Sequence, residues 1–238
     1  MTRTVLVTGG SSGIGRAVAA RFAADGAKVV ITGRTAATVE RAAGELGVEG
    51  VACDAADPGQ AAALAGRLGR VDVLVNAAGG LVPADSGQGS ELDALVAQWH
   101  AHLSQNLLTA VVTTAAVRDG LADGGCVLSI GSIGAERRGG SYGAAKAALA
   151  AWNVALSAEL APRGVTCNVI SAGYIAGTNF FGGGLSEERR RALVDETHNQ
   201  RPGTVDDIAA TAHFLASPGA RHITGQTLHV NGGAHTTR

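Results

Sequence analysis

The sequence predicts an α/β protein in which one parallel sheet is covered by helices on both faces. Three observations lead to this fold class. Short, nearly continuous apolar runs have the length of strands that are buried on both faces. Alanine-rich segments of helical length separate these runs, so right-handed crossovers would produce a doubly wound sheet. Many of the 35 glycines stand where an apolar run ends, which indicates tight turns at one edge of the sheet.

The expected elements alternate along the chain from its first residues onward. Strands are predicted at 4–8, 28–32, 48–53, 71–76, 126–130 and 165–170. Helices are predicted at 13–26, at 38–47, from about residue 58, and at 142–160. Neither a linker nor an internal repeat interrupts the pattern, so residues 1–238 are expected to form a single domain.

The composition argues against several classes of protein. Charged residues make up 16% of the chain and the formal net charge is -1, which gives no basic surface for nucleic acid and no polybasic segment for a membrane surface. No apolar run approaches the length of about 18 residues that a membrane helix needs. The first ten residues lead directly into a strand pattern, so no signal peptide is expected.

Cysteine and histidine usage points to a reducing compartment and away from a metal centre. Cys53, Cys126 and Cys167 are far apart, and each lies in or beside an apolar run, so they are expected to be buried free thiols in a cytoplasmic protein. His100 and His102 are two residues apart and would point in different directions on a helix. Because the sequence contains no zinc motif either, no metal site is expected.

A glycine-rich turn between the first strand and the first helix predicts a dinucleotide-binding site. In open α/β sheets, ligands bind beyond the carboxyl ends of the strands. Glycines at this position let a phosphate approach the backbone, and the helix N-terminus offers unpaired N–H groups to a pyrophosphate. The residues expected to form this part of the site are Gly9, Ser11, Ser12, Gly13, Ile14 and Gly15. The alternative is a turn with a purely structural role.

The end of the second strand indicates which dinucleotide binds. An acidic residue there would accept hydrogen bonds from ribose hydroxyls, whereas an arginine accommodates a 2′-phosphate. The strand ends in Gly33 and Arg34 with no acid, which favours NADP(H) over NAD(H); a solvated surface arginine is the alternative. Asp54, after the third strand, could accept a hydrogen bond from the adenine amino group, although turn and cap roles are as natural for an aspartate.

Further motifs follow in order along the chain. They are the tetrapeptide Asn76-Ala77-Ala78-Gly79 after the fourth strand, Asn106 in a helical segment, Ser132 after the fifth strand, and the pair Tyr142 and Lys146. With the glycine-rich turn, they resemble the cofactor loop, the Asn-Asn-Ala-Gly element, the helix asparagine, the serine and the Tyr-x-x-x-Lys pair of the short-chain dehydrogenases/reductases. The resemblance extends from Thr8 to the Val-Asn-Gly-Gly at 230–233 and implies a Rossmann fold.

The sequence departs from this family pattern in three places. Ala77 replaces the second asparagine of the tetrapeptide, and residues 171–173, Ser-Ala-Gly, replace the Pro-Gly that generally follows the sixth strand. The spacing between serine and tyrosine is also shorter than usual if the serine is Ser132. Ser129 has the usual spacing but lies inside an apolar strand, so Ser132 is the preferred catalytic serine, after a shortened loop, and Ser129 is the alternative.

The spacing of Tyr142 and Lys146 predicts an acid–base pair. Residues four apart share one face of a helix, and Ser141 is a plausible N-cap for the helix 142–160. A phenol has a usual pKa of about 10 and transfers protons poorly at neutral pH. A neighbouring ammonium and a helix N-terminus both favour the phenolate, so the pKa of Tyr142 is expected to be lowered toward the operating pH.

The resemblance implies a ketoreductase of the 3-oxoacyl-(acyl-carrier-protein)-reductase kind. Tyr142 would protonate the alkoxide that forms when a hydride reaches a ketone, and Ser132 would orient the carbonyl. Lys146 would lower the tyrosine pKa and bind the nicotinamide ribose, and Asn106 would hold a water that links Lys146 to solvent. Further cofactor contacts are expected from Ala55, Asn76, Ala78, Gly79, Gly173, Ile175 and Thr178.

Two other functions stay open at this point. One is an NAD-linked alcohol dehydrogenase, which the arginine after the second strand disfavours. The other is a non-catalytic NADP(H)-binding redox sensor or scaffold, which would not need the serine, tyrosine and lysine. The expected substrate is a small carbonyl compound or alcohol; 3-oxoacyl thioesters, small or cyclic ketones, polyketide intermediates and sugars all fit.

Two glycine-rich stretches, 80–90 and 177–186, follow strands and are expected to be loops. The segment 184–196 after the second of them is amphipathic and is flanked by glycines and a Phe-Phe pair. Residues 178–200 therefore form a possible substrate lid on glycine hinges, with an ordinary surface helix as the alternative. The helix 142–160 and the chain end 227–235 resemble the family's subunit contacts, which implies a homo-oligomer, either tetramer or dimer.

Overall fold

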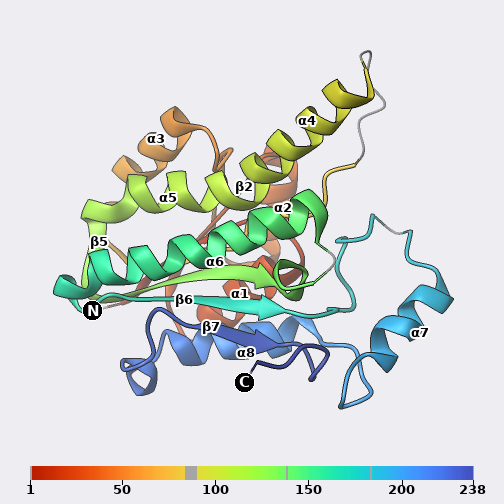
Figure 1. Cartoon of the computed structure of the whole chain (residues 1–238). Coiled ribbons are helices and arrows are strands. Elements are labelled where there is room, and N and C mark those ends of the chain that lie inside the picture. The colour runs from red at the N-terminus through yellow and green to blue at the C-terminus, as the bar shows by residue number, and fades with distance from the viewer. Residues whose placement is uncertain (1, 84–89, 138, 183, 238) are drawn as a thin grey trace.

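The computed structural model describes residues 2–83, 90–137, 139–182 and 184–237, and a seven-stranded sheet runs through its centre (Figure 1). The strands are β1 (Thr4–Thr8), β2 (Lys28–Gly33), β3 (Glu49–Ala52), β4 (Val71–Asn76), β5 (Leu121–Ser132), β6 (Thr166–Ala172) and β7 (Thr227–Val230). Their order in the sheet is β3-β2-β1-β4-β5-β6-β7, and every neighbouring pair is parallel. The predicted doubly wound parallel sheet is therefore confirmed.

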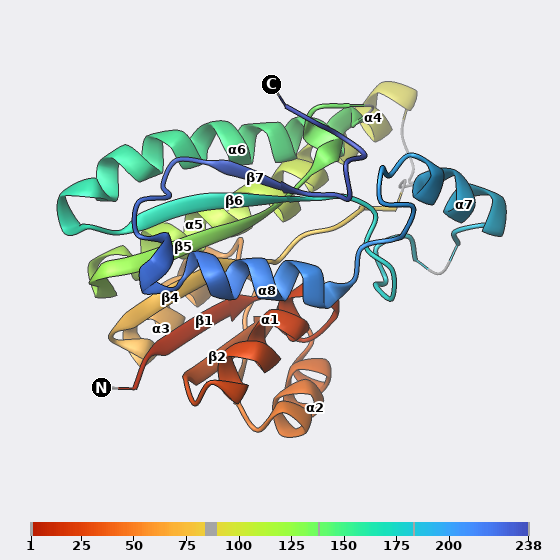
Figure 2. The same ribbon diagram turned by 90° about the horizontal axis from the view of Figure 1, so that it is seen from below.

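Helices cover both faces of this sheet (Figures 1 and 2). One face carries α1 (Gly13–Ala24), α2 (Ala36–Leu46) and α8 (Val205–Leu215), and the other carries α3 (Pro58–Leu68), α4 (Glu91–Leu103), α5 (Thr109–Val117) and α6 (Gly140–Leu160). A π-helical turn, Ser104–Leu108, joins α4 to α5. The remaining helix, α7 (Glu187–Asp195), lies beyond the carboxyl ends of the strands, to the right in Figure 1.

Each face of the sheet has its own apolar core. Successive strand side chains point to opposite faces, so Val5 and Val7 of β1 belong to the core under α1 and α8, whereas Leu6 belongs to the core under α3 and α5. Burying one side chain of this size stabilises the fold by about 1.5–3 kcal/mol relative to leaving it exposed. Because both cores are closed, the strand ends are held in fixed positions.

The direction of winding reverses between β1 and β4, which creates a crevice at their carboxyl ends. The hydroxyl of Thr8 bridges this crevice by accepting hydrogen bonds of 3.2 Å from the N–H groups of Ala77 and Ala78. At Gly9 the backbone has a φ of +66°, and an added Cβ would lie 2.8 Å from the backbone nitrogen of Ala78. The two loops can approach this closely because Gly9 has no side chain.

Several elements differ from the sequence expectation. The structure adds α4, α5, α8 and β7, and it starts β5 at Leu121. The expectation that Ser141 caps α6 is wrong, because α6 begins at Gly140 and its N-cap is Gly139. Residues 84–89 and Gly183, in the two predicted loops, lie outside the described residues. Within the described ranges, no helix combines the length and apolar character that a membrane crossing requires.

Candidate active site

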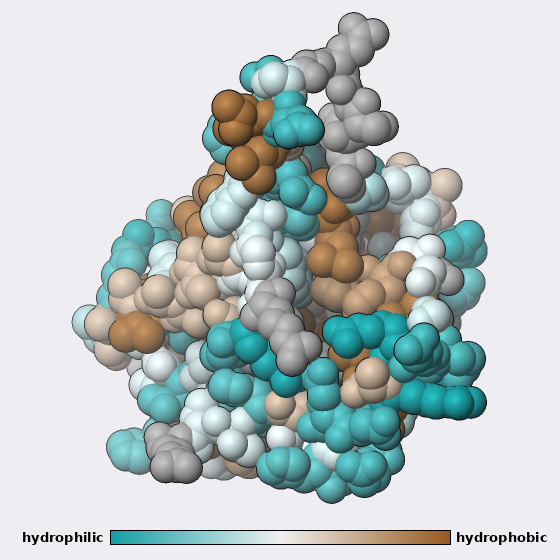
Figure 3. All heavy atoms as spheres, turned by 45° about the vertical axis from the view of Figure 1, so that its right-hand side comes forward, coloured by the Kyte–Doolittle hydropathy of each residue, from teal (hydrophilic) through white to brown (hydrophobic). Residues whose placement is uncertain are grey.

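A continuous cavity lies beyond the carboxyl ends of the strands. Its volume is about 960 Å³, and it extends from the glycine-rich turn after β1 to the segment around α7. Figure 3 brings this end of the molecule forward and shows apolar side chains around a hollow below α4. Cofactor and small-molecule sites usually have volumes of about 300–1,000 Å³, so the cavity is large enough for an extended ligand.

The cavity brings together most of the site residues predicted from the sequence. Those that line it are Gly9, Ser11, Ser12, Gly13, Ile14, Gly15, Arg34, Asp54, Ala55, Ala78, Gly79, Ser132, Tyr142, Lys146, Gly173, Ile175 and Thr178. Asn76 and Asn106 are not among the lining residues, and their side chains are buried. Their predicted roles, a cofactor contact for Asn76 and the binding of a water for Asn106, stay predictions.

The N-terminus of α1 forms one end of the cavity. Ser12 is the N-cap, but its side chain makes no capping hydrogen bond, and the first turn contains no acidic residue. The N–H groups of this turn have no partner within the helix, and the helix dipole favours a negative charge at this end. This arrangement of backbone donors fits a pyrophosphate.

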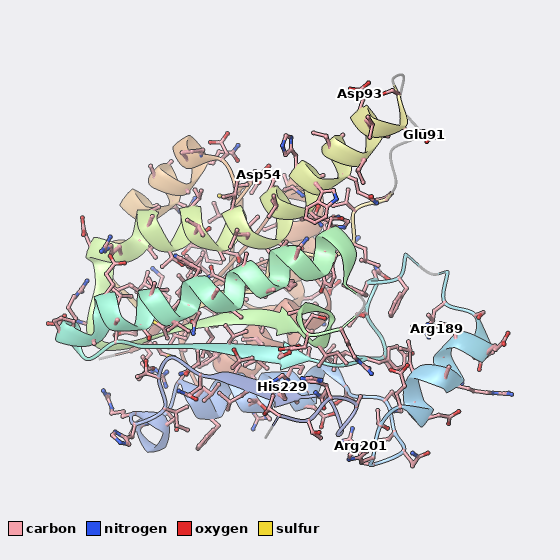
Figure 4. All side chains as sticks on the ribbon, viewed as in Figure 1. Asp54, Glu91, Asp93, Arg189, Arg201 and His229 are labelled. Carbon is pink, nitrogen blue, oxygen red and sulfur yellow. The ribbon has the colours of Figure 1, made fainter. Side chains whose placement is uncertain are left out.

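Arg34 lines the cavity next to Thr35 and Thr38, at the N-terminus of α2. Thr35 is the N-cap of that helix; its hydroxyl makes no capping hydrogen bond, and no acid occupies the first turn. A guanidinium, two hydroxyls and a helix N-terminus together fit a phosphate monoester. Asp54, labelled in Figure 4, also lines the cavity, but its Oδ1 accepts a 3.0 Å hydrogen bond from the N–H of Ala56. The Asp54 carboxylate therefore stabilises the turn in which it lies.

The first two turns of α6 carry Tyr142 and Lys146 to the wall of the cavity. The Nζ of Lys146 donates a 2.8 Å hydrogen bond to the carbonyl oxygen of Ile130 in β5, and it lies 5.9 Å from the centre of the Tyr142 ring. Lys146 is only 5% exposed, and this burial lowers the pKa of its ammonium group to about 8. The helix therefore presents a phenol beside a buried amine.

The pKa of Tyr142 differs from the sequence expectation. Burial raises it to about 12, and a hydrogen bond with the Ser132 side chain opposes this rise only in part. The expected lowering by Lys146 is wrong for this structure, because burial dominates and the amine is directed at the carbonyl of Ile130. The phenol consequently stays protonated at neutral pH, which is the state that a proton donor needs.

The two candidate serines of β5 have different surroundings. Ser132 ends the strand and lines the cavity; its Oγ accepts a 3.1 Å hydrogen bond from the N–H of Gly134. Ser129 is fully buried and lies 3.5 Å from the Nδ2 of Asn76, which also donates to Thr114 at 3.1 Å. The side chain of Asn76 therefore links β4 to the protein interior and is not among the residues that line the cavity. Its predicted contact with the cofactor stays a prediction. Ser132 as the catalytic serine stays a prediction.

Asn106 holds the loop after β4 in place. Its Oδ1 accepts a 2.8 Å hydrogen bond from the N–H of Gly80, and its Nδ2 donates a 2.9 Å hydrogen bond to the carbonyl of the same residue. These hydrogen bonds make Asn106 an anchor of the cavity wall. The predicted binding of a water by Asn106 stays a prediction.

His102, one helical turn earlier, anchors the same loop. Its Nε2 accepts a 3.1 Å hydrogen bond from the N–H of Val82, so the ring proton lies on Nδ1, which is 2.8 Å from the Oγ of Ser141. The ring also packs edge-on against Tyr142, with centroids 6.0 Å apart. In the sequence, His102 was a candidate only for metal binding; its position four residues before Asn106 is the signal that could have paired the two.

Aromatic rings and α7 form the side of the cavity opposite the glycine-rich turn. The ring of Phe180 packs edge-on against Tyr142 at 5.4 Å and against Phe181 at 4.9 Å. Arg189 of α7, labelled in Figure 4, also lines this side. Just beyond α7, Glu196 forms a 2.5 Å ion pair with Arg137 from the loop after β5. This ion pair connects the predicted lid, whose role stays a prediction, to the loop that follows Ser132.

Replacing Lys146 with methionine is expected to stabilise the folded protein at pH 7. The ordinary lysine pKa of 10.5 is lowered to about 8 here, so below pH 8 folding buries a charge at a penalty of about 3 kcal/mol. The substitution removes this penalty but leaves the Ile130 carbonyl without its donor, so a net gain of about 1–2 kcal/mol is expected. Denaturant unfolding at pH 7 measures this difference.

The pH dependence of the same experiment supplies its control. Between pH 8 and pH 10.5 the unfolded wild-type chain holds a proton that the folded chain has lost, so the free energy of unfolding of the wild type rises with pH in this window. The methionine variant lacks this rise, and its advantage should shrink as the pH approaches 10. A constant difference between the two proteins from pH 7 to pH 10 would contradict a lowered lysine pKa.

Comparison with known proteins agrees with this arrangement. A family model described as enoyl-(acyl carrier protein) reductase matches residues 9–235. The 3-oxoacyl-(acyl-carrier-protein) reductase of Escherichia coli (strain K12) is 34% identical over 244 residues, covering 98% of this chain and 97% of that protein. A blue fluorescent protein from a metagenomic library, solved in complex with NADPH, has a TM-score of 0.84 and 35% identity, with 98% of each chain covered.

A further structure extends the match in fold. The short-chain dehydrogenase/reductase SDR:glucose/ribitol dehydrogenase from Brucella melitensis has a TM-score of 0.88 and 32% identity, and the match covers 99% of this chain and 97% of that chain. The family model spans the glycine-rich turn after β1 and α6 with its tyrosine and lysine, and the relatives cover nearly all of this chain. This chain therefore belongs to the short-chain dehydrogenase/reductase family.

Proposed function

We propose that this chain is an NADPH-dependent ketoreductase that uses one domain for cofactor and substrate. The observation that carries the proposal is the pairing of Ser132 with Tyr142. Both side chains line the cavity wall, where Ser132 is close enough to lower the pKa of Tyr142 in part, and burial keeps the phenol protonated. A carbonyl oxygen placed between them can accept a hydrogen bond from both. A protein that only senses or binds a dinucleotide would not need this pair.

In the proposed reaction, each active-site residue of this chain has its own role. When bound, the reduced nicotinamide supplies the hydride. Ser132 orients the carbonyl oxygen of the substrate, and Tyr142 donates its proton to that oxygen as negative charge develops there. Lys146, which lines the cavity 5.9 Å from the centre of the Tyr142 ring, would bind the nicotinamide ribose.

The proposed cofactor is NADP(H), with NAD(H) as the less favoured alternative. The N-terminus of α1 provides backbone donors for the pyrophosphate, and Arg34, Thr35 and Thr38 provide donors for a 2′-phosphate. The metagenomic relative was solved in complex with NADPH, which supports the same choice. An acidic side chain at the position of Arg34 would instead have favoured NAD(H).

Replacing Arg34 with alanine is expected to weaken NADPH binding by about ten- to a hundredfold and to leave NADH binding nearly unchanged. A hydrogen bond to a charged group contributes about 1.5–3 kcal/mol, and only NADPH carries the 2′-phosphate that receives it. Fluorescence titration gives both dissociation constants. Arg41→Ala is the matched control, because that arginine lies within α2, is not among the residues that line the cavity, and has a side chain 70% exposed. Equal losses for the two cofactors would refute the assignment.

The substrate is proposed to be a 3-oxoacyl thioester or a related ketone. The Escherichia coli relative reduces, by its name, a 3-oxoacyl group, whereas the family model is named for enoyl reductases. These substrates differ in the bond that is reduced, C=O or C=C. Ser132 and Tyr142 place two hydroxyl groups on the wall of one cavity, which suits an oxygen that gains negative charge. The geometry therefore favours the carbonyl substrate.

Consumption of NADPH against a substrate panel tests this function. The panel contains 3-oxoacyl thioesters, enoyl thioesters, cyclic ketones and sugars, and the reverse reaction is run with an alcohol and NAD⁺. Turnover of a carbonyl compound supports the proposal. Turnover of enoyl thioesters alone, or of an alcohol with NAD⁺ alone, would replace it with the corresponding activity. Tight NADPH binding without turnover of any compound would favour a sensor or scaffold.

We also infer a homo-oligomer. The outer face of α4 exposes Leu92, Val96 and Trp99 by 72%, 52% and 40%, and Val154 on α6 is 58% exposed. Large apolar side chains grouped on neighbouring helices are typical of a protein interface. Multi-angle light scattering of the purified chain measures the assembly, and a monomer at micromolar concentration would contradict the inference.

A further inference from the structure

Three side chains that can bind metal come from distant parts of the chain and meet near the end of β7. They are Glu136, from the loop after β5, His229, from β7, and His235, near the chain end. Each offers one ligand atom, and these atoms all lie within 4.8 Å of one another. The Oε1 of Glu136 is 3.9 Å from the Nε2 of His229, and the two imidazole centroids are 5.1 Å apart. Figure 4 labels His229 in β7.

The two histidines lie close together because side chains alternate between the two faces of a strand and because a tight turn follows β7. Leu228 and Val230 pack into the core beneath α8, so His229 between them points to the opposite face of the sheet. After the strand, the Oδ1 of Asn231 accepts a 2.9 Å hydrogen bond from a backbone N–H two residues later, and its Nδ2 donates a 2.9 Å hydrogen bond to the carbonyl of His235. Asn231 thereby folds the chain end back and holds His235 against His229.

The donor set matches a first-row transition metal. Two imidazole nitrogens and one carboxylate oxygen are ligands that Zn²⁺ prefers, whereas Mg²⁺ and Ca²⁺ require mainly oxygen ligands. Tetrahedral coordination at a Zn–N distance of about 2.0–2.1 Å places neighbouring ligand atoms about 3.3 Å apart. The ligand atoms are 3.9 Å apart for Glu136 and His229 and within 4.8 Å of one another for the whole cluster, so side-chain rotations have to bring them closer for all three to bind one ion.

Unpartnered polar atoms behind the cluster are a second, independent observation. The Nδ1 of His229 is buried and has no hydrogen-bond partner among the described residues, and the same holds for the hydroxyl of Ser171. Ser171 is the register partner of His229 in β6, so the two side chains lie next to each other on one face of the sheet. A histidine that binds metal through Nε2 carries its proton on Nδ1 and usually donates it to a nearby oxygen. The Ser171 hydroxyl is a side-chain oxygen at the neighbouring register position, and metal binding at Nε2 would give the unpartnered Nδ1 proton a reason to turn toward it.

We propose that Glu136, His229 and His235 form a structural site for a divalent transition-metal ion, with Zn²⁺ as the best-fitting occupant and water as its fourth ligand. None of the three side chains lines the cavity, so the ion stands outside the hydride chemistry. It joins the loop that follows Ser132 to the edge strand and to the chain end. The ion would therefore stiffen the cavity wall from behind, next to the Arg137–Glu196 ion pair.

Isothermal titration calorimetry with Zn²⁺ tests the site, on a chain without a histidine tag because a tag would itself bind zinc. One Zn²⁺ per chain is expected to bind to the wild type, and Mg²⁺ is expected not to compete. Glu136→Gln, His229→Gln and His235→Gln should each weaken the binding by about tenfold or more, as loss of a metal-binding group usually does. His100→Gln, which changes an exposed histidine on α4, should leave it unchanged.

Thermal unfolding with and without Zn²⁺ provides the second readout. A ligand that binds only the folded state raises its stability, so Zn²⁺ should raise the Tm of the wild type and a chelator should reverse the change. His235→Gln changes a residue near the chain end, so its zinc-free Tm should match the wild type while its zinc response is lost. Wild type without one equivalent of bound Zn²⁺, or a zinc response that survives in both histidine variants, would overturn the site and leave His229 and Glu136 as an ion pair.

Discussion

Replacing Tyr142 with phenylalanine is expected to lower kcat about a thousandfold, because proton transfer by a positioned side chain contributes about 10²–10⁴-fold to a rate. The phenol lies on the cavity wall, which Ser132 also lines, and burial keeps it protonated. Phenylalanine keeps the ring that packs against His102 and Phe180 and removes only the hydroxyl. Steady-state kinetics with the best substrate of the panel measure the loss.

Cofactor binding and the two serines supply the controls for this result. NADPH affinity should change little in the phenylalanine variant, because the ring and the fold are retained. Ser132→Ala should lower kcat far more than Ser129→Ala, since only Ser132 lines the cavity. Full activity of Tyr142→Phe would remove the proposed proton donor, and a larger loss for Ser129→Ala would show that the catalytic serine is Ser129.

Replacing Gly143 with alanine is expected to reduce kcat about a hundredfold, the effect that a displacement of about 1 Å can have on a catalytic group. A Cβ on Gly143 would lie 2.2 Å from the carbonyl oxygen of Gly134, a contact with backbone that only a shift of the loop or the helix can relieve. Gly134 donates its N–H to the Oγ of Ser132. The shift therefore separates Ser132 from Tyr142, and kinetics with matched NADPH titrations detect it.

Gly44→Ala is the matched control for this substitution. Gly44 lies in α2, and an added Cβ would meet no atom within 4 Å. Alanine is favoured over glycine in a helix by about 0.5–1 kcal/mol, so this variant should be slightly more stable and fully active. Equal activity of Gly143→Ala and the wild type would show that the loop after β5 adapts without moving its serine.

Local sequence patterns predicted correctly those elements whose position depends on a single local property, such as an apolar run. The apolar run at residues 4–8 predicted β1 because a strand buried on both faces needs no polar position. By contrast, β7 has only four residues, Thr227–Val230, all half-buried, which is too short for a periodicity to appear. The prediction that Ser141 caps α6 failed because the chain already turns into the helix at Gly140.

The roles of individual side chains depended on contacts that no local pattern contains. Asn106 matched a family motif, yet its partner is the backbone of Gly80 across 26 residues. A correct prediction of the Tyr142 pKa requires the burial of the phenol as well as the presence of its neighbour Lys146. The proposed metal ligands Glu136 and His229 are 93 positions apart in the chain, so a search for closely spaced metal-binding motifs does not detect them.

The burial of Lys146 has an evolutionary consequence. A lysine bonded to a strand carbonyl and screened from water makes the fold less stable than an apolar residue of similar length would. Most proteins tolerate such losses only where activity depends on them. A lineage that abandoned both cofactor binding and turnover would gain stability by replacing this residue. The lysine in this chain is therefore the position at which loss of enzymatic activity in a descendant would be expected to appear first.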